Sequence, residues 1–219
     1  GYPTHTFKAP MIYNPYFEQA GIDAVVVPMG VKPEDYESAL HSIFRFTNIR
    51  GALITMPHKV VTCGLVDELS ATAQIAGACN AILLRADGSL LGDMFDGAGF
   101  VRGLLRKDVK LAGARVLVVG SGGVGCAIAA SLAAEEIAEI GLFDVSFDTA
   151  EGLASRLREH YKSLKVTTGS NDPAGYDVVV NATPMGMNDG DKLPMDVSRI
   201  APTTFVGEVV MKKEMTAFL

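Results

Sequence analysis

This chain of 219 residues contains few cysteines, and its acidic side chains outnumber its basic ones. The three cysteines, Cys63, Cys79 and Cys126, lie far apart in apolar stretches, so we expect free thiols in a reducing compartment, the cytoplasm, rather than disulfides. No spacing of histidine, cysteine and aspartate is typical of a metal site, and we expect none. The formal net charge of -6 argues against nucleic acid and anionic membranes as partners.

Long apolar runs are also missing. The longest, such as residues 24–29 and 116–119, have the length of strands, so we expect no membrane span. The chain begins at Gly1 without a methionine or a signal-like segment and ends at Leu219 without a polar tail, so we expect pieces of the same fold to be missing. Its length suits one large domain or two small ones, with an ordinary share of apolar residues, 48%.

The first half of the chain alternates between helix-like and strand-like segments. The expected helices cover residues 10–20, 33–47 and 95–106, and the expected strands cover 24–29, 51–55, 81–84 and 90–91. The last two strands flank Ala86-Asp87-Gly88, which is typical of a hairpin turn.

A new unit begins near Ala112 and continues the alternation with longer, valine-rich strands. The expected strands cover residues 115–119, 139–143, 165–168, 176–181 and 204–210, and the expected helices cover 126–134 and 147–164. Strands that alternate with helices predict an α/β fold with a parallel sheet covered on both faces.

A glycine-rich loop follows the strand over 115–119 and opens the next helix. Its residues are Gly120, Ser121, Gly122, Gly123, Val124 and Gly125. In this context the glycines permit a tight turn, a close approach of the backbone to a pyrophosphate and close helix–strand packing. The helix N-terminus then offers free N–H groups and a positive dipole end to the phosphates.

An acidic residue, Asp144, ends the next strand, 19 residues after Gly125. A carboxylate there can accept hydrogen bonds from both ribose hydroxyls and repels a 2′-phosphate. Because Val145 and Ser146 follow, with no arginine, the predicted cofactor is NAD rather than NADP. The alternative is a structural glycine turn with a solvated aspartate.

The segment from Asn181 to Met187 ends another strand, and ligands of such sheets bind outside the carboxyl ends of the strands. We therefore assign Thr183 and Met185 to the cofactor crevice, together with Gly207 in the last expected strand. A plain proline turn is the alternative for this segment.

Hydride transfer to or from a secondary alcohol requires a proton to move at the same oxygen. Lys59 follows a strand end, Asp96 lies where the first unit leads into the second, and Asn80 lies between them in an apolar stretch. A lysine, a carboxylate and an amide that share one cleft can polarise and position a polyol. Taken alone, such residues are more often solvated surface groups.

Together these motifs resemble the shikimate/quinate dehydrogenase family over nearly the whole chain. The matching segments are Gly1-Tyr2-Pro3 with Pro10 and Asn14, Thr55 to Lys59 (T-x-P-x-K), Gly77 to Asn80 (G-A-x-N), Gly92 with Asp96 to Phe100, Gly120 to Gly125, and Asn181 to Met187. Several ordered motifs at compatible spacing make the resemblance specific.

The resemblance implies two domains with an active site in the cleft between them. Residues 1–95 would form an α/β substrate-binding catalytic domain, and residues 96–219 a Rossmann-type, doubly wound NAD-binding domain. We expect the family's closing C-terminal helices to lie beyond Leu219. Lys59 and Asp96 would be the catalytic pair, with Lys59 handling the hydroxyl proton, while Asn80 and Thr55 would contact substrate hydroxyls.

Two departures concern the substrate. The family holds the substrate carboxylate with two serines, which are replaced here by Phe7 and Ala9. Neither side chain donates a hydrogen bond, so Thr6 and Lys8 are our candidates to hold an acid group instead. Met211 stands where the family has a tyrosine, and we assign it to the substrate site.

Further departures surround the cofactor and the catalytic pair. Met94 and Phe95 replace an asparagine and a threonine before Asp96, and Glu208 replaces an aspartate. Asp144-Val145-Ser146 replaces the N-R-T that binds NADP in the family, so the chain resembles an NAD-preferring branch.

The leading hypothesis is an NAD-dependent oxidoreductase, monomeric or homodimeric, that interconverts a hydroxyl and a ketone on a shikimate- or quinate-like cyclic hydroxy acid. One alternative is a non-catalytic regulatory protein of the same fold that binds a ligand and NAD. A third interpretation changes the reaction, as in the methylene-tetrahydrofolate dehydrogenases, which also carry a lysine in the first domain. The spacing of Asn80 and Asp96 fits the shikimate type better.

Overall fold

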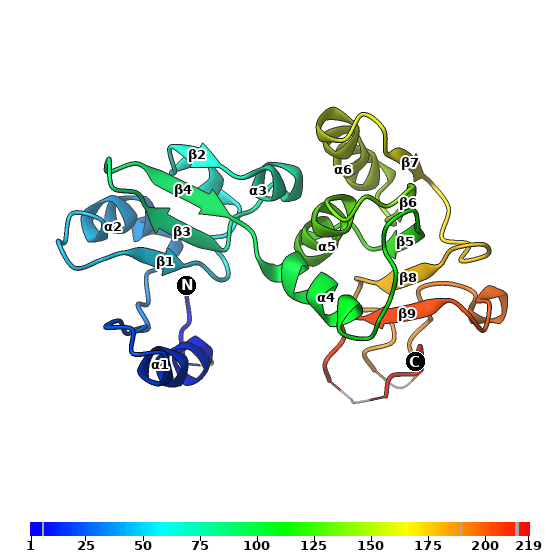
Figure 1. Cartoon of the computed structure of the whole chain (residues 1–219), viewed down its shortest axis with the longest axis horizontal. Coiled ribbons are helices and arrows are strands. Elements are labelled where there is room, and N and C mark those ends of the chain that lie inside the picture. The colour runs from blue at the N-terminus through cyan, green and yellow to red at the C-terminus, as the bar shows by residue number, and fades with distance from the viewer. Residues whose placement is uncertain (6, 189, 213–214) are drawn as a thin grey trace.

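The computed structural model describes residues 1–219 except 6, 189 and 213–214. Two α/β units, each built around its own sheet, are joined by the chain that leads from β4 into α4 (Figure 1). The predicted α/β fold class is thereby confirmed. Within the described residues, no helix combines the length and the apolar character that crossing a membrane requires.

The first unit contains a mixed sheet of four strands in the order β1-β3-β4-β2. The strands are Gly51–Leu53 (β1), Glu68–Leu69 (β2), Ala81–Leu84 (β3) and Leu90–Asp93 (β4). The antiparallel pair β3–β4 is the predicted hairpin, and Gly88 in its turn has a φ of +88° that a glycine adopts readily. β2 pairs with β4 in parallel.

The first unit also contains several short helices. They are α1 (Ala9–Gln19), η1 (Pro33–Asp35), α2 (Tyr36–Ile43) and η2 (Val61–Gly64). Tyr36 and Leu40 of α2 are buried against Ile54 and Ile82 of the sheet region. The helix expected over 33–47 is therefore present but ends earlier.

The strand expected over residues 24–29 was a wrong prediction, because these residues belong to neither sheet of the described structure. Val25 and Val27 are 68% and 57% exposed. The side chain of Asn14 accepts a hydrogen bond from Val26 N at 2.7 Å and donates one to Val26 O at 3.2 Å. An amide side chain thus takes the bonds that a neighbouring strand would otherwise make.

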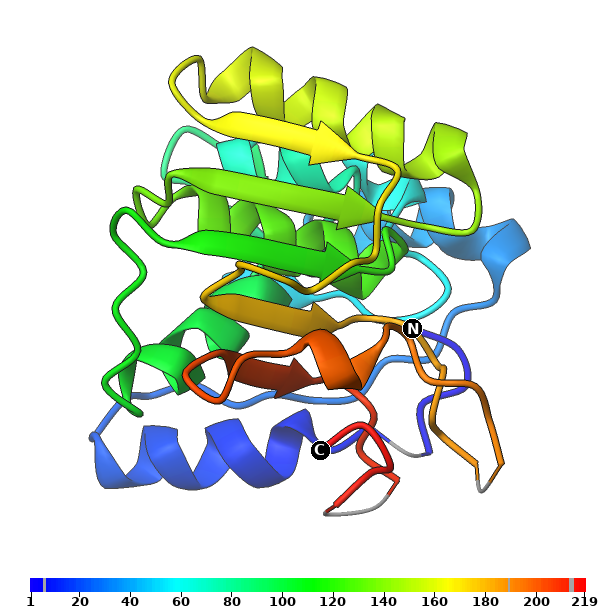
Figure 2. The ribbon, with the colours of Figure 1, turned by 90° about the vertical axis from the view of Figure 1, so that its right-hand side faces the viewer.

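The second unit contains a parallel sheet of five strands in the order β7-β6-β5-β8-β9. The strands are Arg115–Val119 (β5), Glu139–Phe143 (β6), Lys165–Thr168 (β7), Val178–Asn181 (β8) and Phe205–Glu208 (β9). Figure 2 shows their arrows pointing the same way. The order reverses between β5 and β8, and ligands of such doubly wound sheets bind at the carboxyl ends beside that point.

Two helices connect the strands β5, β6 and β7 of this sheet: α5 (Gly123–Ala133) and α6 (Phe147–His160). A short turn, η3 (Val197–Arg199), precedes β9. The strands β5 and β8 are buried almost throughout, as expected for a sheet that is covered on both faces.

The helix α3 (Ala71–Ala76) lies in the first unit by sequence but packs in the core of the second. Its Ala73 and Ile75 are fully buried and share a cluster with Ala127 of α5 and Leu153 of α6. The two units therefore meet through a continuous apolar contact.

The helix α4 (Asp96–Leu105) is the second link between the units, and it packs closely on α5. A Cβ added at Gly97 would lie 1.9 Å from the carbonyl oxygen of Ala127, so only glycine fits there. Close packing at this glycine fixes the position of Asp96, the first residue of the helix.

Candidate active site

Lys59, Asp96 and Asn80 meet where the chain passes from the first unit into α4. Lys59 Nζ donates a hydrogen bond to Asp96 Oδ2 at 2.6 Å, and Asn80 Nδ2 donates one to Asp96 Oδ1 at 2.7 Å. The lysine and aspartate side chains are 28% and 36% exposed, so a ligand can reach them from solvent. The structure therefore brings together the three residues that the sequence singled out for chemistry.

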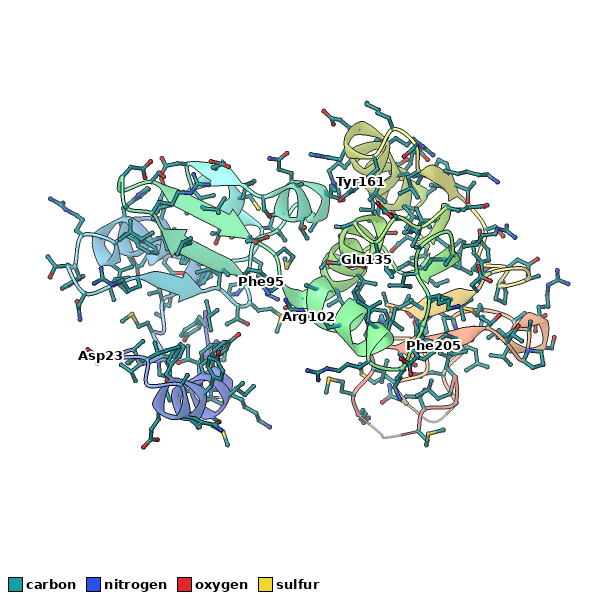
Figure 3. The ribbon with its side chains drawn as sticks, in the orientation of Figure 1. Asp23, Phe95, Arg102, Glu135, Tyr161 and Phe205 are labelled. Atoms are coloured by element: carbon teal, nitrogen blue, oxygen red, sulfur yellow. The ribbon has the colours of Figure 1, made fainter. Side chains whose placement is uncertain are left out.

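The N-terminus of α4 places the carboxylate of Asp96. Phe95 precedes it and lies between the two units in Figure 3, and its N–H donates to Asn80 Oδ1 at 2.9 Å. A helix N-terminus favours a negative charge, which suits an ionised Asp96. Asn80 uses its carbonyl and one N–H in these bonds and keeps one N–H for a ligand. Its contact with Asp96 was not anticipated, because the G-A-x-N motif does not reveal its partner.

The loop that carries Lys59 is held by its neighbours in sequence and in space. His58 is almost fully buried, and its ring stacks on Tyr36 with a centroid distance of 3.9 Å. Its Nε2 lies 2.9 Å from the carbonyl oxygen of Val31. The carbonyl of Lys59 accepts a bond from Cys79 N at 2.8 Å. The backbone at Lys59 is therefore fixed on both sides, and the side chain extends toward Asp96.

Among the described residues, the other expected substrate residues form no hydrogen bond to this pair. Thr55 packs against the N-terminus, where a Cβ at Gly1 would lie 2.3 Å from its Cγ2. Lys8 is exposed at the N-terminal end of α1, and Met211 is 94% exposed. Thr6 lies outside the described residues.

The glycine loop has the local geometry that a dinucleotide requires. A Cβ at Gly125 would lie 1.8 Å from the carbonyl oxygen of Gly120, which itself has a φ of +103°. A Cβ at Gly122 or Gly123 would meet nothing within 4 Å, and Val124 is 44% exposed. Two glycines thus close the turn, and the other two leave open space at the N-terminus of α5. Open space at a helix N-terminus is where a phosphate group can be bound.

Asp144 is held beside this loop. Its Oδ2 accepts a hydrogen bond from Ser121 N at 2.8 Å, and its Oδ1 accepts one from Ser146 N at 2.9 Å. Each carboxylate oxygen keeps acceptor capacity for a ribose hydroxyl. The buried hydroxyl of Ser121 has no hydrogen-bond partner among the described residues. The two backbone N–H groups of Ser121 and Ser146 therefore hold the Asp144 carboxylate in place without a bound cofactor.

A buried amide organises the segment after β8. Asn181 is fully buried, its Oδ1 accepts from Thr183 N and Oγ1, and its Nδ2 donates to Met185 O at 3.0 Å. The same Nδ2 lies 3.0 Å from Glu208 Oε1 at the end of β9. Thr183 and Met185 therefore lie at the carboxyl end of β8, beside the switch point. The role of Glu208 in holding this segment was missed because 27 residues separate it from Asn181.

Close packing requires a glycine at position 207. A Cβ there would lie 2.5 Å from the ring of Phe100 on α4. This glycine therefore lies in β9 where the strand faces α4, and its predicted contact with the cofactor stays a prediction.

The chain resembles known proteins over its whole length. Residues 1–82 match the shikimate dehydrogenase substrate binding domain, and residues 104–187 match the shikimate / quinate 5-dehydrogenase family. A shikimate dehydrogenase (NADP(+)) of Rubrobacter xylanophilus is 35% identical over 215 residues, which cover 97% of this chain and 75% of the relative.

Solved structures agree with this match. Shikimate 5-dehydrogenase of Listeria monocytogenes, crystallised with shikimate and NAD, has a TM-score of 0.90 at 25% identity. The match covers 100% of this chain and 79% of the Listeria chain. The ligand-free 5-ketofructose reductase of a Gluconobacter strain has a TM-score of 0.82 at 26% identity, covering 95% and 76% of the two chains. Because two family models match this chain and the Rubrobacter relative is 35% identical, the chain belongs to the shikimate/quinate dehydrogenase family.

Proposed function

We propose that this protein is an NAD-dependent dehydrogenase that interconverts a hydroxyl and a ketone on a shikimate- or quinate-like cyclic hydroxy acid. The observation that carries the proposal is the cluster in which Asp96 accepts bonds from both Lys59 and Asn80 at 2.6 and 2.7 Å. Residues 1–95 would bind the substrate, and residues 96–219 the dinucleotide. The family membership supports the reaction class.

The chemistry of the cluster follows from its charges. A bound nicotinamide supplies or accepts the hydride. In the reduction direction, the Lys59 ammonium donates a proton to the carbonyl oxygen of the substrate, and in oxidation the neutral Nζ accepts the hydroxyl proton. Asp96 stabilises the charged ammonium and directs it, and the free N–H of Asn80 is available to a neighbouring hydroxyl of the substrate.

Asp144 supports NAD as the cofactor. Its carboxylate lies beside the glycine loop and is held there by the N–H groups of Ser121 and Ser146. A 2′-phosphate would meet this negative charge without an arginine directly after it, since Val145 follows and is 91% exposed. The Rubrobacter relative is named for NADP(+), so cofactor preference is a property to be measured in this chain.

A second candidate is the reduction of a neutral polyhydroxy ketone. Phe7 and Ala9 favour it, because neither can donate a hydrogen bond to a carboxylate. The similar structure of a 5-ketofructose reductase adds weight to it. A non-catalytic protein is disfavoured, since both members of the catalytic pair are present and in contact.

The test is a panel of substrates measured by the absorbance of reduced cofactor. Shikimate, quinate and related hydroxy acids are offered with NAD and with NADP, and neutral diketones and ketoses are offered with the reduced cofactors. Turnover of a ring acid with NAD is the expected result. Turnover of neutral ketones alone would support the second candidate, and no turnover on any substrate, with the cofactor bound, would contradict both.

A further inference from the structure

Arg156 on α6 forms a hydrogen bond across the junction of the two units. Its Nε donates to the carbonyl oxygen of Ile75 at 2.6 Å, although 81 residues separate them in sequence. Ile75 lies in the last turn of α3, where helix carbonyls lack partners within the helix. A guanidinium at that end is favoured both by its charge and by its N–H groups.

The same guanidinium is linked to the glycine loop by hydrogen bonds through the thiol of Cys126. Arg156 Nη2 donates to Cys126 Sγ at 3.8 Å, and Cys126 Sγ donates to the carbonyl oxygen of Ser121 at 3.1 Å. Burial raises the pKa of the Cys126 thiol, so it keeps the proton that it donates. Ser121 N in turn donates to Asp144 at 2.8 Å. Arg156 is thus connected to the loop and to the acid expected at the cofactor ribose.

On its other side, Arg156 is connected to the catalytic pair. Gly77 ends α3 in the left-handed conformation, and the chain then leads directly to Asn80. In that short segment, Cys79 N donates to the carbonyl of Lys59 at 2.8 Å, and Asn80 Nδ2 donates to Asp96. The residues that follow α3 therefore hold the backbone of Lys59 and the side chain of Asp96.

We propose that Arg156 is a positioning residue that sets the separation between the Lys59–Asp96 pair and the cofactor loop. It acts through Ile75 and Cys126 and touches neither substrate nor cofactor. Its kinetic consequence rests on the proposed dehydrogenase function, because hydride transfer depends steeply on the distance between the reacting atoms. A displacement of about 1 Å far from the chemistry can lower the rate about 100-fold.

Arg158, two residues further along α6, provides a matched control. Its guanidinium donates to Glu151 Oε1 at 2.5 Å and to the carbonyl oxygen of Val166 at 3.1 Å. Both partners lie within the second unit. Replacing Arg158 therefore removes a comparable set of bonds from the same helix without touching the junction.

The first test measures amide hydrogen exchange on the full chain and needs no substrate. Arg156→Ala is expected to raise exchange in two separate segments, residues 75–80 and residues 120–126. Arg158→Ala is expected to change only α6 and β7. Faster exchange in just one of the two segments, or the same pattern in both variants, would overturn the proposal.

The second test is kinetic. Arg156→Ala is expected to lower kcat about 10-fold or more while the KM values for substrate and cofactor stay near those of the wild type. Arg156→Lys keeps a charged donor and is expected to recover part of the loss, and Arg158→Ala to match the wild type. A folded Arg156→Ala protein with unchanged kcat would overturn the proposal while leaving the dehydrogenase function intact. A wild type that is inactive on every substrate would remove the function, and hydrogen exchange would still decide the role of Arg156.

Discussion

Lys59 owes its position to contacts that its own side chain does not make. The buried ring of His58 stacks on Tyr36, and Cys79 N binds the Lys59 carbonyl at 2.8 Å. The flexible lysine stem is thereby left with one principal partner, Asp96, at 2.6 Å. A lysine that is fixed at its backbone loses less freedom on orienting its ammonium toward a substrate oxygen.

Asp144 decides cofactor choice in this account. Asp144→Ala removes the charge that repels a 2′-phosphate, so we expect the ratio of kcat/KM for NAD over NADP to fall by about 10-fold or more. Steady-state kinetics with both cofactors measures that ratio. Asp148→Ala is the control, because Asp148 is an exposed carboxylate in the first turn of α6. An equal ratio in the wild type and Asp144→Ala would show that Asp144 does not select the cofactor.

At the scale of elements, the packing of α4 on α5 positions Asp96, the proposed catalytic aspartate. A Cβ at Gly97 would lie 1.9 Å from the Ala127 carbonyl, whereas a Cβ at Gly103 on the same helix meets nothing within 4 Å. We expect Gly97→Ala to lower the free energy of unfolding by about 1–3 kcal/mol. Gly103→Ala should raise it by about 0.5–1 kcal/mol, since alanine is the better helix former.

Urea unfolding of the two glycine variants measures both effects. Gly97→Ala should also lose activity, because α4 would have to shift and carry Asp96 with it. Equal stability of the two variants would mean that α4 does not pack on α5 at Gly97.

The starts of three strands are joined by one carboxylate. Glu139 on β6 accepts bonds at 3.1 Å from Arg115 on β5 and from Lys165 on β7. Burial by itself raises the pKa of Glu139, but the bonds from the two cations outweigh it and hold the pKa below its usual range. A lowered pKa in the folded state means that the carboxylate stabilises the fold above the ordinary pKa of a glutamate. That stabilisation is lost as the pH falls through the lowered value.

Glu139→Gln should therefore lower the free energy of unfolding by about 1–2 kcal/mol at neutral pH. The difference from the wild type should shrink below about pH 4.3, the ordinary pKa of a glutamate, as the wild-type carboxylate becomes protonated. Chemical denaturation over a range of pH measures it. A difference that is constant with pH would show that the charge of Glu139 is not involved.

The strands also show which parts of the fold could be predicted from the sequence. The strands 115–119, 139–143 and 165–168 have the predicted bounds. For the first two the reason is that buried parallel strands are mostly apolar runs that end at clear turn signals. Residues 24–29 look equally apolar, yet the side chain of Asn14 takes the backbone bonds of Val26. A pattern of apolar residues predicts burial but does not reveal whether a partner strand exists.

The candidate site shows the same limit. Lys59, Asp96 and Asn80 could be named from ordered motifs, but their contacts follow from the fold. The helix α3 has six residues, too few to show a helical period, and it packs in the core of the other unit. Arg156 carries no local signal, because its partner Ile75 is 81 residues away.

At the scale of the whole molecule, α3 of the first unit packs in the apolar core of the second, and α4 lies in the chain between the last strand of one sheet and the first strand of the other (Figure 1). The cluster of Lys59, Asn80 and Asp96 lies where the chain passes from the first unit into α4. The glycine loop lies at the N-terminus of α5, the helix on which both α3 and α4 pack. This arrangement is consistent with a substrate and a dinucleotide that meet between the units, as the proposed reaction requires.

The most direct test of the central claim compares Lys59→Ala and Lys59→Arg with the wild type, measuring turnover on the best substrate and the dissociation constant of NAD. Lys59→Ala should lower kcat about 10²–10⁴-fold and leave NAD binding unchanged, because the Lys59 side chain bonds to Asp96 and not to the glycine loop. Lys59→Arg keeps the charge beside Asp96 but cannot release a proton near neutral pH, so it should also be nearly inactive. Turnover by either variant close to that of the wild type would remove Lys59 from proton transfer and contradict the account.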